Sequence, residues 1–99
     1  MKIKYDKTIW WKMCREKLKR EYQERGITSC ELKFDGCMKD FAMSFHHRHK
    51  RWWYINKPDL LGYFNQTVLT CASCHQKAEA STELTKYVFK TLRNDNPEG

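Results

Sequence analysis

The chain has 99 residues, which is enough for one domain and too short for two domains of ordinary size. It carries 19 Lys and Arg against 12 Asp and Glu, a formal charge of +7, and only 40% of its residues are hydrophobic. This composition excludes a large apolar core, and no apolar run approaches the roughly 20 residues that span a bilayer. We therefore expect no membrane association, a polyanionic partner, and a bound metal that stabilises the fold.

The amino-terminal residues Met1-Lys-Ile-Lys lead directly into charged sequence and lack the apolar core of a signal peptide. We therefore expect a cytoplasmic protein. In that reducing compartment the five cysteines are expected to be metal ligands or buried thiols rather than disulfides.

Residues 7–25 are predicted to form a basic amphipathic helix. Its apolar stripe consists of Trp11, Cys14, Leu18 and Tyr22, at spacings of three and four, and Gly26 suits the position that ends a helix. The stripe indicates that Cys14 is packed rather than metal-bound. The helix can dock on the rest of the chain or on a second copy, so a monomer and a homodimer both stay open.

The other four cysteines form two pairs, Cys30 with Cys37 and Cys71 with Cys74. The second pair has CxxC spacing and is followed directly by His75. Two such pairs can place four thiolates tetrahedrally around one structural zinc ion and close the long loop between them. The alternative is that some of these cysteines are buried as small hydrophobic side chains.

The remaining elements alternate short strands and helices. Apolar residues at positions 41, 43 and 45 predict a strand that ends at His46 and His47, and the sequence TVLT at 67–70 predicts a second strand. At the end of the first strand, both of these histidines are expected to face His75 across the hairpin. Residues 48–65 have no sustained period, and Pro58 can open a short helical turn. Helices are predicted from about Ala72 and from Ser81 or Thr82. The predicted fold class is α+β: an amino-terminal helix (1–27), a zinc-containing domain (28–93) and a flexible tail (94–99).

The chain resembles the HNH, or ββα-metal, endonuclease superfamily, and in particular its small zinc-containing phage members. The matching residues are Cys30 and Cys37, HHRHKR at 46–51 and LTCASCHQ at 69–76, so the resemblance covers about residues 28–80. It implies a metal-dependent DNA endonuclease or nickase, in the host cytoplasm if a phage encodes it.

The resemblance also implies roles for individual residues. His46 and His75 would hold a catalytic divalent cation, Mg²⁺, Mn²⁺ or Ni²⁺, and His47 would act as the general base that deprotonates water. The middle asparagine of the family falls on Gln66 by spacing, with Asn65 one residue earlier. Either Asn65 fixes the hairpin, the interpretation we favour, or Gln66 replaces it as a longer amide.

A basic and aromatic segment follows the paired histidines and is predicted to contact DNA through Arg48, His49, Lys50, Arg51, Trp52 and Trp53. Its cations suit phosphates and its aromatic rings suit bases, which would favour branched, nicked or single-stranded DNA. Each residue also has a structural interpretation. His49 and the cations can belong to a solvated loop, and the aromatic rings can belong to the core.

Two other functions remain open at this point. The chain could be a non-catalytic, zinc-containing module of the same fold that binds DNA or a protein, or an unrelated zinc-containing regulator. A pure binder needs the cysteines and the basic surface but not His46, His47 and His75 together. These three histidines therefore favour the nuclease.

Overall fold

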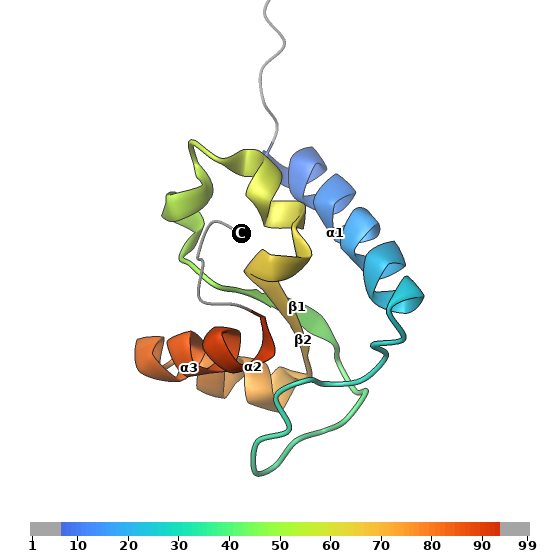
Figure 1. Ribbon diagram of the computed structural model, residues 1–99, viewed down its shortest axis with the longest axis vertical. Coiled ribbons are helices and arrows are strands. Elements are labelled where there is room, and N and C mark those ends of the chain that lie inside the picture. Colours follow the sequence, from blue (N-terminus) through green and yellow to red (C-terminus); the bar gives the residue numbers. More distant parts are fainter. Residues whose placement is uncertain (1–6, 94–99) are drawn as a thin grey trace, which may run out of the picture.

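The computed structural model describes residues 7–93, so the tail expected at 94–99 and the first six residues lie outside the described part. Three helices and one small sheet follow one another in the order α1 (Lys7–Glu24), β1 (Ser44–His47), β2 (Thr67–Thr70), α2 (Ala72–Glu79) and α3 (Thr82–Leu92) (Figure 1). Three short 3₁₀ segments separate the strands: Arg51–Tyr54, Pro58–Gly62 and Phe64–Gln66. The fold is a small α+β arrangement, as the sequence predicts.

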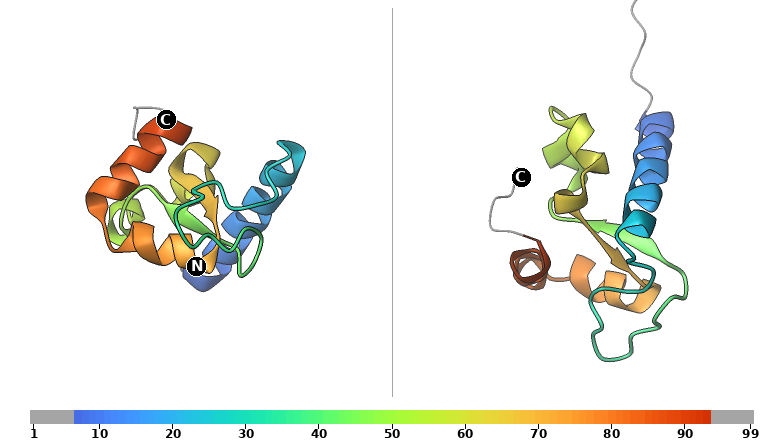
Figure 2. Two further views of the ribbon diagram at one scale, coloured as in Figure 1. Left: turned by 90° about the horizontal axis from the view of Figure 1, so that it is seen from below. Right: turned by 45° about the vertical axis from the view of Figure 1, so that its right-hand side comes forward.

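The two strands pair antiparallel, with Ser44 opposite Thr70 and His47 opposite Thr67. Because side chains alternate along a strand, this sheet presents different residues to its two sides. Phe45 packs with Leu18 and Tyr22 of α1, whereas His46 lies against α2 and α3. The sheet therefore lies between α1 on one side and the α2–α3 pair on the other (Figure 2).

The predicted stripe of α1 is the face that packs on the rest of the chain. Cys14, Leu18 and Tyr22 are buried, and Cys14 packs with Tyr54 and Leu61 rather than with the other cysteines. A Cβ atom at Gly62 would lie 3.3 Å from the Cys14 sulfur, which is a tight contact, so glycine lets the chain approach α1 closely here. The docking of α1 within the same chain is thus confirmed.

The first strand is shorter than the alternation predicted, because residues 38–43 are irregular and only Ser44–His47 pair. The partner strand has just four residues, since a 3₁₀ turn precedes it and Cys71 caps the helix that follows. Lys39 and Ala42 also adopt positive φ angles of 59° and 52°, which are incompatible with a strand. The loop geometry around the cysteines therefore overrides the local pattern.

A buried ion pair connects distant parts of the chain. The Arg93 guanidinium contacts the Glu31 carboxylate at 2.7 Å and also donates to the Tyr22 hydroxyl and the Phe64 and Thr67 carbonyls. Glu31 in turn accepts a hydrogen bond from the Leu69 N–H through its carboxylate. The end of α3, the segment carrying Cys30, α1 and β2 are thereby linked through one arginine.

Within residues 7–93, no helix combines the length and the apolar character that crossing a membrane requires.

Candidate metal sites and the basic cleft

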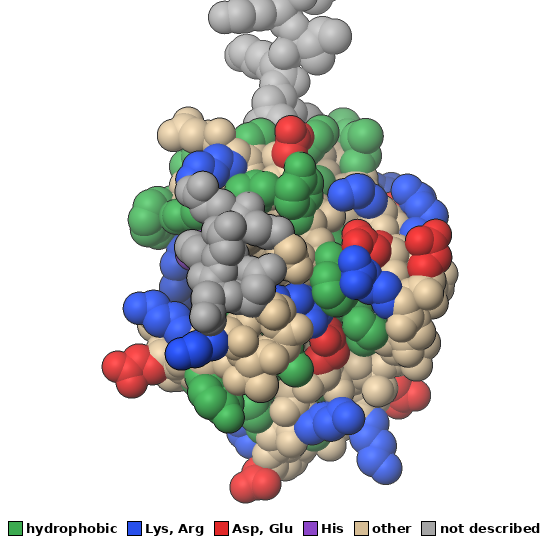
Figure 3. Space-filling model, in the orientation of Figure 1, with side chains coloured by type: hydrophobic (Ala, Val, Ile, Leu, Met, Phe, Trp, Pro, Cys, Tyr) green, Lys and Arg blue, Asp and Glu red, His purple; other side chains and the backbone are tan. Residues whose placement is uncertain are grey.

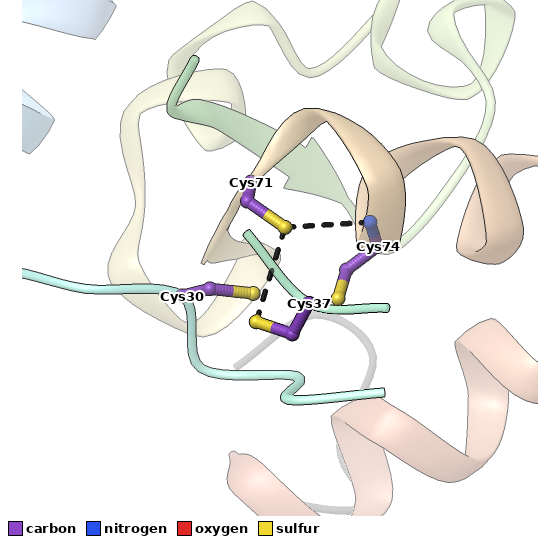
Figure 4. Close-up of side chains that lie close together, drawn as sticks. All are labelled: Cys30, Cys37, Cys71 and Cys74. Atoms are coloured by element: carbon purple, nitrogen blue, oxygen red, sulfur yellow. Dashed lines mark hydrogen bonds between the residues drawn. The ribbon is translucent and has the colours of Figure 1, made fainter. Parts of the chain in front are cut away.

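Cys30, Cys37, Cys71 and Cys74 come together at the amino-terminal end of α2, with their sulfur atoms all within 4.8 Å of one another (Figure 4). Cys71 is the N-cap of α2, and its sulfur accepts hydrogen bonds from the backbone N–H groups of Cys74 at 3.5 Å and Met38 at 3.3 Å. Burial opposes ionisation of Cys71, but these N–H donors stabilise its thiolate and the net effect lowers its pKa.

The dimensions of this cluster fit a tetrahedral zinc ion. Zinc–sulfur bonds of about 2.3 Å place the sulfur atoms of such a site about 3.8 Å apart. The sulfur atoms of Cys37 and Cys71 are 3.9 Å apart. Three of the four cysteines are buried and Cys37 is half-buried, so the cluster leaves little room for a fifth ligand. The cluster could therefore hold a structural metal ion, as the sequence predicts.

His46 projects from β1 toward α2 and α3 and is only 4% exposed. Its Nε2 lies 3.0 Å from the Thr85 hydroxyl oxygen, and that hydroxyl donates its single proton to the Ala78 carbonyl at 2.8 Å. Thr85 can therefore only accept from His46, which places the imidazole proton on Nε2 and the lone pair on Nδ1. Burial, with a smaller effect from the charge of His75, lowers the pKa of His46 to about 4 and keeps the ring neutral.

The Nδ1 atom of His46 is buried and has no hydrogen-bond partner within the described residues. The centroids of the His46 and His75 rings are 5.1 Å apart, and Oε1 of the Glu79 carboxylate lies 3.7 Å from His46 Nδ1. A buried acceptor without a partner is unfavourable unless something binds it, so this lone pair is suited to a metal ion.

His75 and Glu79 lie one turn apart on α2, with His75 Nε2 at 3.2 Å from Glu79 Oε1. On its other side His75 is held by the Ser44 hydroxyl, 2.6 Å from Nδ1. Together with His46, these residues offer two nitrogens and one oxygen within 4.8 Å of one another. Two imidazoles and one carboxylate suit Mn²⁺, Ni²⁺, Fe²⁺ or Zn²⁺ better than Mg²⁺, which prefers oxygen ligands.

Glu79 is a candidate ligand that the sequence analysis missed. Its spacing of four residues from His75 on a predicted helix puts both side chains on one face, so the signal was present in the sequence. The contribution of Thr85 had no comparable signal, because it depends on how α3 packs against β1.

His47 points to the opposite side of the sheet from His46, so of the two expected to face His75 only His46 does. Its Nε2 donates to the Leu61 carbonyl at 2.9 Å, which fixes the proton on Nε2 and the lone pair on Nδ1. Trp11 and Tyr54 pack edge-on against the ring, with centroids at 5.0 and 5.4 Å. Burial lowers its pKa to about 4, so His47 is neutral at physiological pH. The orientation and the tautomer of its ring are therefore fixed.

Two neighbouring amides, Asn65 and Gln66, are candidates for the middle position of the histidine motif, and their surroundings differ. Gln66 is fully buried and its side-chain oxygen accepts from the Tyr54 hydroxyl at 3.0 Å. Asn65 is half-buried, and its backbone carbonyl accepts from the Arg48 guanidinium at 3.1 Å. Both residues thus fix the segment after His47, and the role predicted for Asn65 stays a prediction.

His46, His47, His75 and Glu79 all line one cleft of about 690 Å³. Among the described residues that line it, Glu79 is the acidic one, and five are basic: Arg48, Lys50, Arg51, Lys86 and Lys90. Lys86 and Lys90 belong to α3 and were not predicted as contacts. In Figure 3, Lys and Arg side chains lie over α1 and α3 with acidic side chains between them. The lining of the cleft therefore has a clear excess of basic over acidic side chains.

Residues 48–53, which are predicted to contact DNA, include some side chains packed against the fold and others that are exposed. The Arg48 guanidinium lies over the Phe89 ring and bonds to the backbone, so it holds the loop in place. Trp53 stacks on His49 with centroids 3.9 Å apart, and Lys57 lies over the same indole. Trp52, by contrast, is 70% exposed. Arg51 lies over the Trp11 ring, which also packs against His47.

Comparison with known proteins gives no relative: no family model, curated protein or solved structure matches this chain significantly.

Proposed function

We propose that this protein is a metal-dependent DNA endonuclease or nickase of the HNH type. The proposal rests on one observation: a group of candidate metal ligands and a neutral histidine line the same cleft. The buried, unpartnered Nδ1 of His46 faces His75 and Glu79, and the neutral His47 lines the same basic cleft. The resemblance of the motifs at 46–51 and 69–76 to that superfamily supports the same function.

A divalent cation held by His46, His75 and Glu79 would stabilise the charge that develops on the phosphate and on the leaving oxygen. His47 would take a proton from the attacking water through Nδ1, because Nε2 is committed to the Leu61 carbonyl. The same carbonyl stabilises the imidazolium that results, since the Nε2–H continues to donate to it. Arg51, whose guanidinium lies over the Trp11 ring beside His47, would bind the phosphate.

A non-catalytic binding module remains the second candidate, because the five cations of the cleft and the cysteine cluster are sufficient for binding a polyanion. Binding alone requires neither the unpartnered Nδ1 of His46 nor the fixed ring of His47. We therefore favour hydrolysis.

The test is cleavage of supercoiled plasmid and of a branched oligonucleotide in Mn²⁺, Mg²⁺ or Ni²⁺ by the zinc-loaded protein. We expect the wild type to nick or cut, and His47→Ala to lose about 10²–10⁴-fold in rate while keeping its zinc, its circular dichroism spectrum and its DNA binding. Tyr87→Ala, an exposed aromatic outside the cleft, is the control for an unrelated truncation. Equal rates for the wild type and His47→Ala, or no cleavage in any of these metals, would reject the proposal.

A further inference from the structure

The cleft has the size of a site for one or two nucleotides. Its volume of about 690 Å³ falls in the range of sites that enclose a small molecule. His46 lines this cleft and is almost fully buried. A phosphate must therefore enter the cleft to come near the His46, His75 and Glu79 group.

Two cationic walls enclose the cleft. One wall is the segment 48–54, which contributes Lys50 and Arg51, and the other is α3, which contributes Lys86 and Lys90 from one face of the helix, four residues apart. A single nucleic-acid backbone lying between these walls would contact cations on both sides. Proteins that bind single strands use such a positively charged groove together with aromatic side chains that stack on bases.

Trp52 supplies the aromatic surface on the wall that carries Arg51. It lines the cleft and is 70% exposed, whereas its neighbour Trp53 is packed between His49 and Lys57. A single exposed hydrophobic residue has no meaning by itself. An exposed indole in a cationic cleft, next to a half-buried one that the fold packs between two side chains, has the position of a base-stacking residue.

We propose that the cleft binds a single, unpaired DNA strand, with Trp52 stacked on a base and Lys86 and Lys90 bound to the backbone. This inference rests on the site of the proposed function and assigns its substrate class: DNA that is unpaired at the bond presented to the cleft. We expect intact duplex to bind less tightly, because its bases are paired and stacked on one another and cannot stack on Trp52.

The test is fluorescence anisotropy of a labelled 12-nucleotide single strand and of the same sequence as a duplex, with the zinc-loaded His47→Ala protein and no added divalent cation. We expect the single strand to bind at least tenfold more tightly than the duplex. Adding Trp52→Ala should weaken single-strand binding about tenfold and duplex binding less than twofold. Adding Lys86→Gln and Lys90→Gln should reduce the salt dependence of single-strand binding.

Tyr87→Ala in the same background is the matched control, since it removes an exposed aromatic from α3 outside the cleft lining and should change neither affinity. Duplex binding as tight as single-strand binding, or an equal loss of both with Trp52→Ala, would overturn the inference. The outcome is independent of cleavage. Single-strand preference without any nicking rejects only the proposed function, and nicking without such preference rejects only this inference.

Discussion

The two groups of candidate metal ligands share one helix but differ in almost every property. Cys71 and Cys74 lie at the amino-terminal end of α2, whereas His75 and Glu79 lie farther along it. The cysteine cluster is closed, made of four thiols and largely buried. The second group has two nitrogens and one oxygen, and the side chain of Glu79 is 57% exposed toward a cleft. Closed sites with four ligands are typical of structural zinc, and open sites with three are typical of catalysis.

The shared helix explains why the two groups belong together. A metal ion bound by Cys71 and Cys74 would fix the start of α2, and His75 follows Cys74 directly. The position of His75 and Glu79 relative to His46 would then depend on the first ion. We propose that the two groups have different functions: an ion in the cysteine cluster would stabilise the fold, and an ion held by His46, His75 and Glu79 would be exchangeable.

The largest expected effect comes from removing the closed site. Cys74→Ser should lose zinc and cooperative thermal unfolding, because structural zinc contributes about 10–16 kcal/mol in small domains. The control is Cys14→Ala, which removes a buried thiol that packs with Tyr54 and Leu61, and which should keep one zinc per chain and cost only about 1–3 kcal/mol. Metal analysis measures the zinc content of each variant, and circular dichroism melting measures its unfolding. Cooperative unfolding of Cys74→Ser without bound metal would end the distinction between the two groups.

The next effect concerns the ion pair that links the cysteine-bearing segment to the rest of the chain. Arg93→Ala leaves the buried Glu31 carboxylate without its partner and should lower the free energy of unfolding by about 3–5 kcal/mol, measured with urea. Arg25 lies over the same Phe64 ring but forms only an exposed pair with Glu21. Arg25→Ala should therefore cost less than about 1 kcal/mol. Similar losses for the two variants would show that Arg93 does not link the segments.

The smallest effect should be confined to the open site. Thr85→Val keeps the shape of the side chain but removes the oxygen that accepts from His46 Nε2. Without this partner the imidazole is no longer held with its lone pair on Nδ1, and Mn²⁺ affinity should fall about tenfold. Titration of the zinc-loaded protein, followed by electron paramagnetic resonance, measures the affinity. Thr85→Ser should restore it, and equal affinities for Thr85→Val and Thr85→Ser would contradict this role.

The cysteine cluster and the helices could be predicted from the sequence because their signals are local. CxxC spacing, the apolar stripe through Leu18 and the Pro58 turn each depend on residues close in sequence. The start of β1 at Ser44, rather than at residue 41, could not be predicted. It depends on β2, which has only four residues and pairs Thr70 with Ser44.

The histidine site was only partly predictable for the same reason. His46 and His75 are adjacent to recognisable motifs, and Glu79 follows from helical spacing. By contrast, Trp11 beside His47, Thr85 beside His46, and the lysines of α3 reach the cleft from helices outside those motifs. Their contribution depends on which residues of the sheet α1 and α3 meet, and the local sequence shows only which face of a helix packs.

The most direct test of the division between the two groups is anomalous diffraction from crystals of the zinc-loaded protein soaked in Mn²⁺. We predict a zinc peak among the four cysteine sulfurs and a separate manganese peak bounded by His46 Nδ1, His75 Nε2 and the Glu79 carboxylate. A zinc peak alone, with no manganese beside His46 at saturating Mn²⁺, would contradict the assignment of this group as the exchangeable metal site.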